Sequence, residues 1–224
     1  MIRIFDVDYT IIKKPSTWYF LREALDKDII NVSQIRQFPL EWIRYKLGSP
    51  NMNFIEEAVR HFAGIEQALL DQIARDSFEH RMKFNIYTGA ANLIREALDR
   101  GEKVIFATSS LHTLIQPLER FFGIEGSIAN TLEFTDGKTS GKIVGNSFFG
   151  LHKKAAVEAW LEKNGFYPSE ACFYSDSYTD LPLLEFCGKP VAVNPDWILA
   201  HKAKKRGWDI LRFTTTLGSG AVSK

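Results

Sequence analysis

Short apolar runs alternate with longer amphipathic segments over most of this chain, and this alternation restricts the fold more than any other feature. Segments 103–110 and 171–176 have the length and the residue types of buried strands. Segments 88–101 and 153–165 instead place apolar residues three and four positions apart, which is the helical period. Strands that alternate with helices form a mainly parallel sheet covered on both faces. We therefore predict an α/β fold with a doubly wound sheet.

The individual elements of this pattern can be placed along the chain. The predicted strands are 2–8, 103–110, 171–176 and, as the last strand, 190–194. The predicted helices that alternate with them are 88–101, 111–123, 153–165 and 179–188. Asp136 and Gly137 form a strong turn dipeptide, so we expect a hairpin over 128–145. The Gly-, Ser- and Thr-rich tail over 214–224 is expected to be frayed.

A block of helical patterns separates the first predicted strand from the rest of the α/β pattern. Its periodic segments are 17–28, 33–48, 54–64 and 66–84. We predict that residues 1–14 and 85–224 form the core domain and that residues 15–84 form an inserted α-helical cap. The large aromatic side chains of the cap are expected mainly to pack inside a helical bundle. They occur there together with several arginines: Trp18, Tyr19, Phe20, Arg22, Trp42, Arg44 and Arg60.

Composition excludes several classes of protein. Of the 224 residues, 45% are hydrophobic and 25% are charged, which argues against wholesale disorder. The formal net charge of +1 argues against a dedicated nucleic-acid binder. No apolar run approaches the roughly 18 residues of a membrane span, and no secretory leader is visible, so a cytoplasmic protein is expected. Cys172 and Cys187 lack the spacing of metal or redox sites and are expected to be core thiols.

Two carboxylates, Asp6 and Asp8, stand at the end of the first predicted strand. A buried carboxylate is costly unless it is paired or bound to a metal. Residues two apart on an extended segment point to one face, and ligands of doubly wound sheets bind beyond the carboxyl ends of the strands. Thr108 and Asp176 fall at the same edge, and three acids there suit Mg²⁺. For the two acids alone, a solvated strand exit is the alternative interpretation.

The other candidate residues at this edge each have an alternative role. Lys153 and Lys154 compete for one functional position, and the other lysine is then a helix-surface charge. Asp180 lies nearby and is also explained as an acid favoured by the positive end of a helix dipole. Thr108 alone is explained as an N-cap or loop hydroxyl.

Four serines and histidines near these positions are weaker candidates. Ser109 and Ser110 are candidate substrate-binding residues that offer backbone or hydroxyl donors to phosphate, with turn formation as the alternative. His112 and His152 are expected to have surface or packing roles.

Four motifs in this order resemble those of the haloacid dehalogenase (HAD) superfamily, specifically its phosphoserine-phosphatase-like branch (subfamily IB) with a helical cap. The motif DxDx(T/V) is matched by DVDYT at 6–10, and an apolar strand ending in Ser or Thr is matched by VIFAT at 104–108. A Lys at a helix start is matched by GLHKKAAVEAWL at 150–161, and an acidic pair after a strand by YSDSYTDLPLL at 174–184. The resemblance covers nearly the whole chain.

The resemblance implies a HAD-like Rossmannoid core and a magnesium-dependent phosphatase that acts on a small phosphorylated metabolite. It implies that Asp6 is the nucleophile that forms an aspartyl-phosphate, and that Asp8 is the general acid and then the general base. Magnesium would be held by Asp6, Asp176 and the backbone carbonyl of Asp8.

For the remaining motif residues, the resemblance implies supporting roles. Thr108 would donate a hydrogen bond to a phosphoryl oxygen. Lys153 would neutralise charge on the nucleophile and the transferred group, and Asp180 would support Lys153 or a metal-bound water.

The chain departs from the family pattern at two places. Ser175 stands where the family often has Gly. The segment after Thr10 reads IIKKPSTW and lacks the Glu with which phosphoserine phosphatases bind the substrate amine. Lys13 and Lys14 would repel an ammonium group, which argues against phosphoserine as the substrate. They are explained either as a feature that attracts an anionic substrate or as an exposed basic turn.

Two further functions use the same scaffold. A phosphotransferase would use the same residues and pass the phosphoryl group to an alcohol. A non-catalytic phosphate-binding or interaction protein is the second alternative, although such proteins usually lose the nucleophile or the acid. Dehalogenase chemistry is disfavoured because it needs no acid two residues after the nucleophile, and Asp8 is present.

Overall fold

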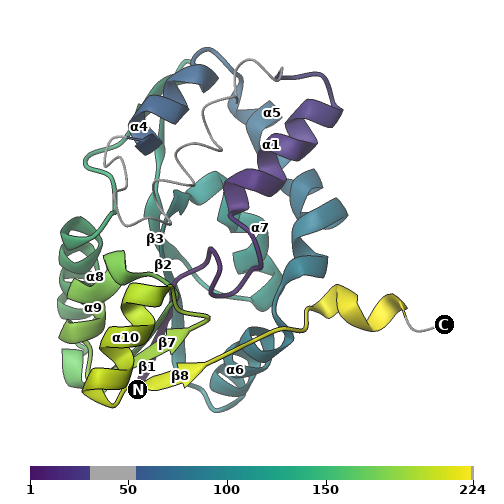
Figure 1. Cartoon of the computed structure of the whole chain (residues 1–224). Coiled ribbons are helices and arrows are strands. Elements are labelled where there is room, and N and C mark those ends of the chain that lie inside the picture. The colour runs from purple at the N-terminus through teal and green to yellow at the C-terminus, as the bar shows by residue number, and fades with distance from the viewer. Residues whose placement is uncertain (31–53, 223–224) are drawn as a thin grey trace.

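A parallel sheet with helices on both faces forms the lower part of the molecule in Figure 1. The computed structural model describes residues 1–30 and 54–222. The predicted helix over 33–48, with Trp42 and Arg44, lies outside the described residues. Six of the described strands form one sheet in the order β3-β2-β1-β6-β7-β8, and each neighbouring pair is parallel. These strands are β1 (Ile2–Phe5), β2 (Lys103–Leu111), β3 (Ser127–Asn130), β6 (Ala171–Ser175), β7 (Lys189–Val193) and β8 (Asp209–Leu211).

The central strands are buried on both faces, which explains their nearly continuous apolar sequence. In β1, Ile2 and Ile4 point to one face and Phe5 to the other, as the two-residue period of a strand requires. One face packs against α6 (Thr88–Asp99) and α7 (His112–Phe122). The other packs against α8 (Leu151–Lys163), α9 (Leu181–Phe186) and α10 (Trp197–Arg206). The predicted doubly wound α/β fold is confirmed.

The described part of the predicted cap segment contains three α-helices, and the first and third of them pack beside α7. The three helices are α1 (Ser16–Asp26), α4 (Phe54–Val59) and α5 (Gln67–Ser77), and α5 is followed by a π-helical turn (Phe78–Met82) and a 3₁₀ turn (Lys83–Asn85). The helical character expected over 66–84 is confirmed, although the helix type changes in the second half of the segment. Phe20 and Ile73 share an apolar cluster with Leu114 of α7, so burial joins these helices to the α/β part. The division into residues 1–14 and 85–224 against 15–84 stays a prediction.

The hairpin expected over 128–145 is confirmed only in part. β4 (Leu132–Thr135) and β5 (Lys138–Ile143) pair antiparallel around Asp136 and Gly137, both of which have positive φ. The residues before them belong instead to β3, which pairs with β2 in the main sheet. One predicted arm is thus two short strands in two different sheets.

The expectation that 190–194 is the last strand is wrong, because α10 and β8 follow β7 and extend the sheet. The tail, over its described residues 214–222, also differs from the expected fraying, since it contains a 3₁₀ segment (Leu217–Val222). The N–H of Leu217 donates to Ile86 O at 2.9 Å. A Cβ added to Gly89 would lie 2.3 Å from the Phe213 ring, which shows how closely the C-terminal segment packs against α6.

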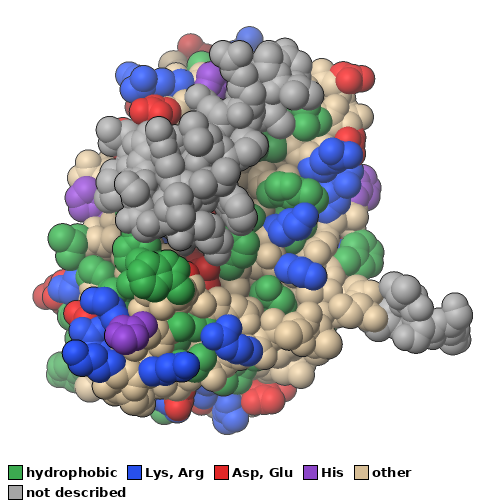
Figure 2. Space-filling view, viewed as in Figure 1, with side chains coloured by type: hydrophobic (Ala, Val, Ile, Leu, Met, Phe, Trp, Pro, Cys, Tyr) green, Lys and Arg blue, Asp and Glu red, His purple; other side chains and the backbone are tan. Residues whose placement is uncertain are grey.

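Basic side chains gather over α10 on the lower left of the molecule (Figure 2). The last turn of α10 carries Lys204, Lys205 and Arg206, where positive charge interacts favourably with the carboxyl end of the helix dipole. In the described part of the chain, no helix has both the length and the apolar character that crossing a membrane requires.

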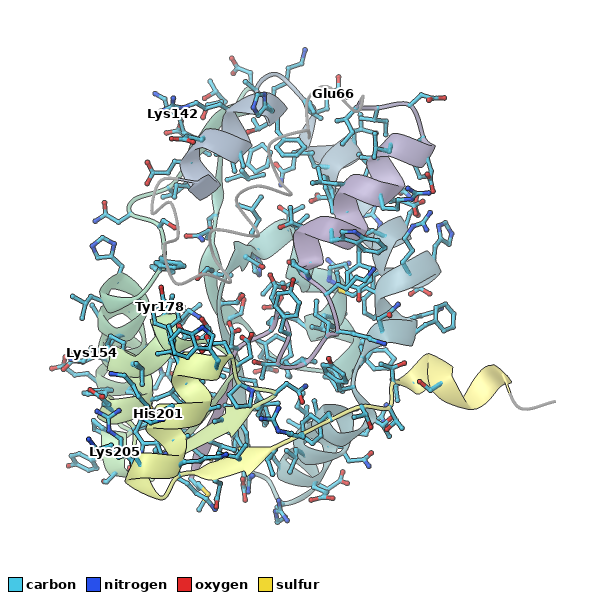
Figure 3. All side chains as sticks on the ribbon, viewed as in Figure 1. Glu66, Lys142, Lys154, Tyr178, His201 and Lys205 are labelled. Atoms are coloured by element: carbon cyan, nitrogen blue, oxygen red, sulfur yellow. The ribbon has the colours of Figure 1, made fainter. Side chains whose placement is uncertain are left out.

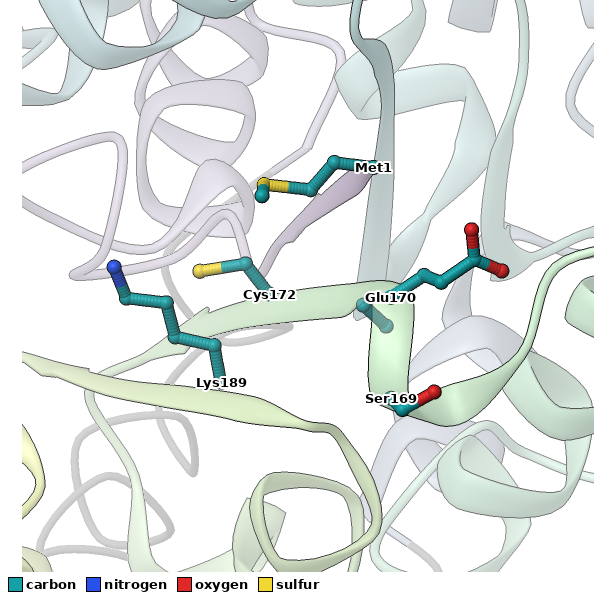
Figure 4. Close-up of a pocket in the computed structure, with 6 residues that line it drawn as sticks. Met1, Ser169, Glu170, Cys172 and Lys189 are labelled. Atoms are coloured by element: carbon teal, nitrogen blue, oxygen red, sulfur yellow. The ribbon is translucent and has the colours of Figure 1, made fainter.

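A shallow pocket lies at the amino-terminal ends of β1, β6 and β7 (Figure 4). Met1, Cys172 and Lys189 are among its lining residues. The pocket is at the opposite end of the strands from Asp6 and Asp8, so it is not part of the predicted site.

Candidate active site

The predicted site residues lie at the carboxyl ends of three neighbouring strands, Thr108 within β2 and Asp6 and Asp176 directly after β1 and β6. Phe5 of β1 is in register with Phe106 of β2 and Tyr174 of β6. Asp6 therefore lies between these two strands, and its N–H continues the ladder by donating to Tyr174 O at 2.9 Å. Thr108 and Asp176 come two residues after the paired positions. The sheet register thus brings residues from distant parts of the sequence to one edge.

A tight turn follows β1 and separates Asp6 from Asp8. The carbonyl of Val7 accepts hydrogen bonds from the N–H groups of Ile11 and Ile12 at 2.8 and 3.2 Å. Tyr9 has a φ of 61°, a left-handed conformation that costs a non-glycine residue about 1–2 kcal/mol. The buried Val7 and the sheet hold the turn in this strained form, and the turn directs Asp8 toward the beginning of α1.

Lys153 is the buried cation of the site. Its Nζ donates to Asp6 Oδ1 at 3.1 Å and lies 2.8 Å from Asp180 Oδ1. The hydroxyl of Ser175 donates to the other oxygen of Asp180 at 2.7 Å. All four side chains are buried, so these bonds offset the cost of removing three charges from water.

Burial raises the pKa of Asp6 to about 7, although the Lys153 ammonium opposes this shift. Burial also disfavours the charged form of Lys153. The charges of Asp180 and Asp6 outweigh that effect, so the pKa of Lys153 is raised and the ammonium remains protonated. The site therefore pairs a permanent positive charge with a carboxyl group that is poorly solvated.

Asp8 is held by two donors from different elements. The Ser16 N–H, in the first residue of α1, donates to Asp8 Oδ1 at 2.8 Å, and the Ser110 hydroxyl donates to Oδ2 at 2.8 Å. Burial raises the pKa of Asp8, and these hydrogen bonds oppose the rise by favouring the ionised form. Asp6 and Asp8 thus have different partners, which suits two different chemical roles.

The end of β2 is fixed by a second set of hydrogen bonds. Thr108 Oγ1 accepts from the Ser110 N–H at 3.1 Å. The Ser109 hydroxyl donates to Phe148 O at 2.7 Å. The side-chain amide of Asn130 bridges Ser109 O and the Phe148 N–H, so it links this strand end to the segment before α8. The hydroxyls of both candidate substrate-binding serines are therefore engaged with protein acceptors.

Asp176 is 2% exposed and follows β6 directly. Its carbonyl accepts from the Asp196 N–H at 2.8 Å. Asp196 also caps α10 through Leu199 N and accepts from Tyr178 N. The loop after β6 is thereby tied to the loop after β7, which fixes the backbone that carries Asp176.

The two competing lysines have different surroundings. Lys154 lies on the outer side of α8, where it pairs with Glu158 at 2.5 Å (Figure 3). The structure therefore brings Lys153, and not Lys154, to Asp6. His112 lies near Glu119, and His152 lies near Ser147 O, as expected for packing or surface roles.

The predicted site carries an excess of negative charge, which suits a hard cation. Four predicted carboxylates, those of Asp6, Asp8, Asp176 and Asp180, outnumber the single predicted ammonium of Lys153. Within residues 1–30 and 54–222, no three His, Cys, Asp or Glu side chains form a metal-binding group. The predicted magnesium set needs only the side chains of Asp6 and Asp176 with one backbone carbonyl, a small protein contribution that is typical of Mg²⁺.

Sequence reasoning missed Ser16, the functional contact of Ser175, and Asn130. Ser16 had one available signal, since Ser is common at helix starts, but its bond to Asp8 depends on the turn at Tyr9. Ser175 was noted only as a departure from Gly. The side chain of Asn130 bonds to Ser109 and Phe148, which are 21 and 18 residues away in the sequence, and no local pattern predicts contacts over such separations.

Comparisons with known proteins identify similar chains. Phosphoserine phosphatase SerB1 of Mycobacterium tuberculosis is 28% identical over 214 residues, which cover 93% of this chain and 70% of SerB1. Histidinol-phosphatase of Neisseria meningitidis serogroup C is 27% identical over 218 residues, which cover 95% of this chain and 98% of that phosphatase. A protein of unknown function from Bordetella pertussis Tohama I has the same fold, with a TM-score of 0.83 and 25% identity. The superposition covers 94% of this chain and 97% of the Bordetella chain.

A substrate-bound phosphoserine phosphatase structure superposes with a TM-score of 0.67 at 18% identity and covers 94% of this chain and 91% of its own. This likeness supports the fold. The family model described as haloacid dehalogenase-like hydrolase matches residues 4–185, a range that contains all four motifs. The chain therefore belongs to the haloacid dehalogenase-like hydrolase family, as its motifs predicted.

Proposed function

We propose that this protein is a magnesium-dependent phosphatase that hydrolyses a small phosphomonoester through an aspartyl-phosphate on Asp6. The observation that carries the proposal is the buried contact of Lys153 with Asp6, next to an Asp8 that is held separately. Family membership supports hydrolysis, and relatives named as phosphatases support the phosphate ester as the substrate class.

In the first step, a carboxylate oxygen of Asp6 attacks phosphorus as the bond from phosphorus to the ester oxygen breaks. Asp8 gives its proton to that oxygen, and the alcohol leaves. Lys153 and the Thr108 hydroxyl offset the charge on the transferred group. Asp180 and Ser175 keep the Lys153 ammonium in place.

In the second step, water attacks phosphorus and Asp8 takes a proton from that water. The bond between phosphorus and the Asp6 oxygen breaks, so inorganic phosphate leaves and the Asp6 carboxylate is restored. Asp8 is again protonated, and the cycle is balanced. Asp6, Asp176 and the carbonyl of Asp8 would hold Mg²⁺, which supplies positive charge that offsets the phosphate and the carboxylates.

The beginning of the predicted cap segment supports an anionic substrate. Lys13 and Lys14 are exposed, and Lys14 Nζ lies 3.8 Å from the centroid of the Trp18 ring. The negative face of the aromatic ring attracts this ammonium group. A basic surface in place of an acid disfavours a substrate that carries an ammonium group. We therefore propose a phosphorylated metabolite other than phosphoserine.

Phosphate release from a panel of phosphomonoesters tests this function. The purified protein is assayed with Mg²⁺, with a chelator, and as the Asp6→Asn variant. We expect turnover that needs Mg²⁺ and that falls by several orders of magnitude in Asp6→Asn. An Asp26→Asn variant, altered at an exposed acid of α1, is the control and should retain turnover.

Each panel is repeated with added alcohol acceptors. Phosphoryl transfer to an alcohol without release of phosphate would contradict hydrolysis and identify the protein as a phosphotransferase. Absence of both reactions in folded protein that binds Mg²⁺ would contradict an enzymatic role. Faster turnover of phosphoserine than of the other esters would contradict the proposed substrate class.

A further inference from the structure

Two serines from separate elements meet at Asp8. Ser16 begins α1 and is 0% exposed, and Ser110 lies near the end of β2 and is 7% exposed. Their hydroxyl oxygens are 2.7 Å apart. Ser110 Oγ is also 2.8 Å from Asp8 Oδ2, and the Ser16 N–H donates to Asp8 Oδ1 at 2.8 Å. Both oxygens of this carboxylate are thus engaged by donors.

The number of available protons sets the direction of these bonds. Each serine hydroxyl has one proton. While Asp8 is ionised, the Ser110 hydroxyl donates to it, and Ser110 Oγ then accepts from the Ser16 hydroxyl. In that state the hydrogen bonds run from Ser16 to Ser110 and from Ser110 to Asp8. Replacing the Ser16 hydroxyl would leave the buried Ser110 oxygen without its donor.

We propose that Ser16 and Ser110 are positioning residues that hold Asp8 in the orientation needed for proton transfer to the leaving group. This inference rests on the proposed function and adds two residues to it. A general acid must lie within hydrogen-bond reach of the atom that it protonates. Two donors on two carboxylate oxygens restrict rotation about the side-chain torsions, so they fix where the proton is delivered.

This role differs from the substrate-binding role expected for Ser110. The Ser110 hydroxyl proton is already committed to Asp8, and its oxygen is committed to Ser16. A phosphate oxygen would have to displace one of these buried bonds. The contact geometry therefore favours an action through Asp8.

The test compares esters whose leaving groups differ in basicity. A nitrophenolate leaves readily without a proton, whereas an alkoxide needs one, so only the poor leaving group depends on a well-placed acid. The ratio kcat/KM includes every step up to departure of the leaving group. It is measured for the wild type, Ser110→Ala and Ser16→Ala with alkyl, phenyl and nitrophenyl phosphates.

For Ser110→Ala we expect kcat/KM to fall by about tenfold or more with alkyl phosphates, because general acid catalysis contributes about 100-fold or more and a misplaced acid loses part of this factor. With nitrophenyl phosphate, which does not need the acid, we expect a fall of about twofold or less. Ser16→Ala keeps the backbone N–H, so we expect a smaller loss, about threefold with the alkyl ester, as for one hydrogen bond. The change in leaving-group dependence is a readout that a merely structural role would not move.

Ser77→Ala is the matched control. Ser77 is another fully buried serine, and its hydroxyl donates to Ala74 O within α5, away from Asp8. Its loss should change thermal stability without changing the leaving-group dependence. Equal dependence in the wild type and Ser110→Ala, with an active wild type, would overturn the positioning role alone. A wild type without any turnover would overturn the proposed function and the positioning role together.

Discussion

Lys153 Nζ lies 3.1 Å from Asp6 Oδ1 and 2.8 Å from Asp180 Oδ1, so one buried ammonium serves two buried carboxylates. These residues come from the end of the first strand, the start of α8 and the loop after β6. Their meeting joins three parts of the chain at the proposed reaction centre. It also links catalysis to stability, because the same charges take part in both.

Replacing this ammonium should affect both properties. In Lys153→Met, Asp6 and Asp180 lose their buried partner, and we expect the free energy of unfolding to fall by about 3–5 kcal/mol. Phosphatase turnover should fall by several orders of magnitude because the charge on the transferred group is no longer offset. Denaturant unfolding and phosphate release measure the two effects.

Lys154→Met is the neighbouring control. Its pair with Glu158 is a surface contact, so a change of about 0.5 kcal/mol or less is expected, with turnover retained. If Lys153→Met does not fold, Lys153→Met combined with Asp6→Asn removes one of the two unpaired charges and should recover part of the stability. No recovery would contradict the buried ion pair.

Gly150 sets the start of α8 and thereby the position of Lys153. It has φ 54° and ψ −117°, a conformation that is open to glycine but strained for alanine. A Cβ there would meet only Thr179 O at 3.8 Å, so the effect of Gly150→Ala comes from backbone strain and not from a clash. We expect a loss of about 1–3 kcal/mol in unfolding free energy together with lower turnover, because the helix start must shift.

Gly165 lies after the other end of the same helix, with φ 73° and open space where a Cβ would lie. Gly165→Ala should lose stability by about 1–2 kcal/mol and keep turnover, since Lys153 is not displaced. Denaturant unfolding measures the backbone strain in both variants, and phosphate release shows whether Lys153 has been displaced. Equal turnover in the two alanine variants would show that the start of α8 tolerates the change.

The core strands and the motif residues were predictable because each is encoded locally. Apolar runs identify β1, β2 and β6, and polar residues just after a strand in a parallel sheet meet at one edge. The resemblance assigned the lysine role to Lys153, and the structure places this side chain beside Asp6.

The remaining elements depend on tertiary contacts that leave little local signal. β8 is three residues long and exists because Ile210 pairs with Ala192 of β7. The π-helical turn after α5 interrupts a helical pattern that continues in the sequence. The turn between β1 and α1, across which Ser16 reaches Asp8, contains Tyr9 with a positive φ, and propensity argues against this conformation.

His112 and Glu119 should make stability depend on pH. His112 Nε2 lies 3.2 Å from Glu119 Oε2, and this hydrogen bond, with the charges of Glu119 and Asp71, raises the pKa of His112 against the effect of burial. A raised folded-state pKa stabilises the protein below the unfolded pKa of about 6.5, and this contribution is lost as pH rises through the folded value.

The free energy of unfolding of the wild type minus that of His112→Gln should therefore decrease as the pH rises from below the unfolded pKa of about 6.5 to above the raised folded value. Denaturant unfolding at several pH values measures this difference. His201→Gln, altered at an exposed residue of α10, is the control and should follow the wild type. A difference that stays constant across this range would contradict the predicted pair.

The two cysteines should be unreactive in the folded protein. Cys172 and Cys187 are 1% and 6% exposed, which confirms that they are core thiols. Burial raises the pKa of both thiols, that of Cys187 to about 12, so at neutral pH almost none of either is the reactive thiolate. An aromatic disulfide reagent should modify both thiols at the rate at which the protein opens, and immediately in denaturant.

Asn146→Cys adds an exposed thiol as a control that should react at once in the folded state. If the wild-type thiols reacted as fast as that added thiol, Cys172 and Cys187 would have to be accessible, and the packing of β6 against its neighbours would be looser than the structure shows.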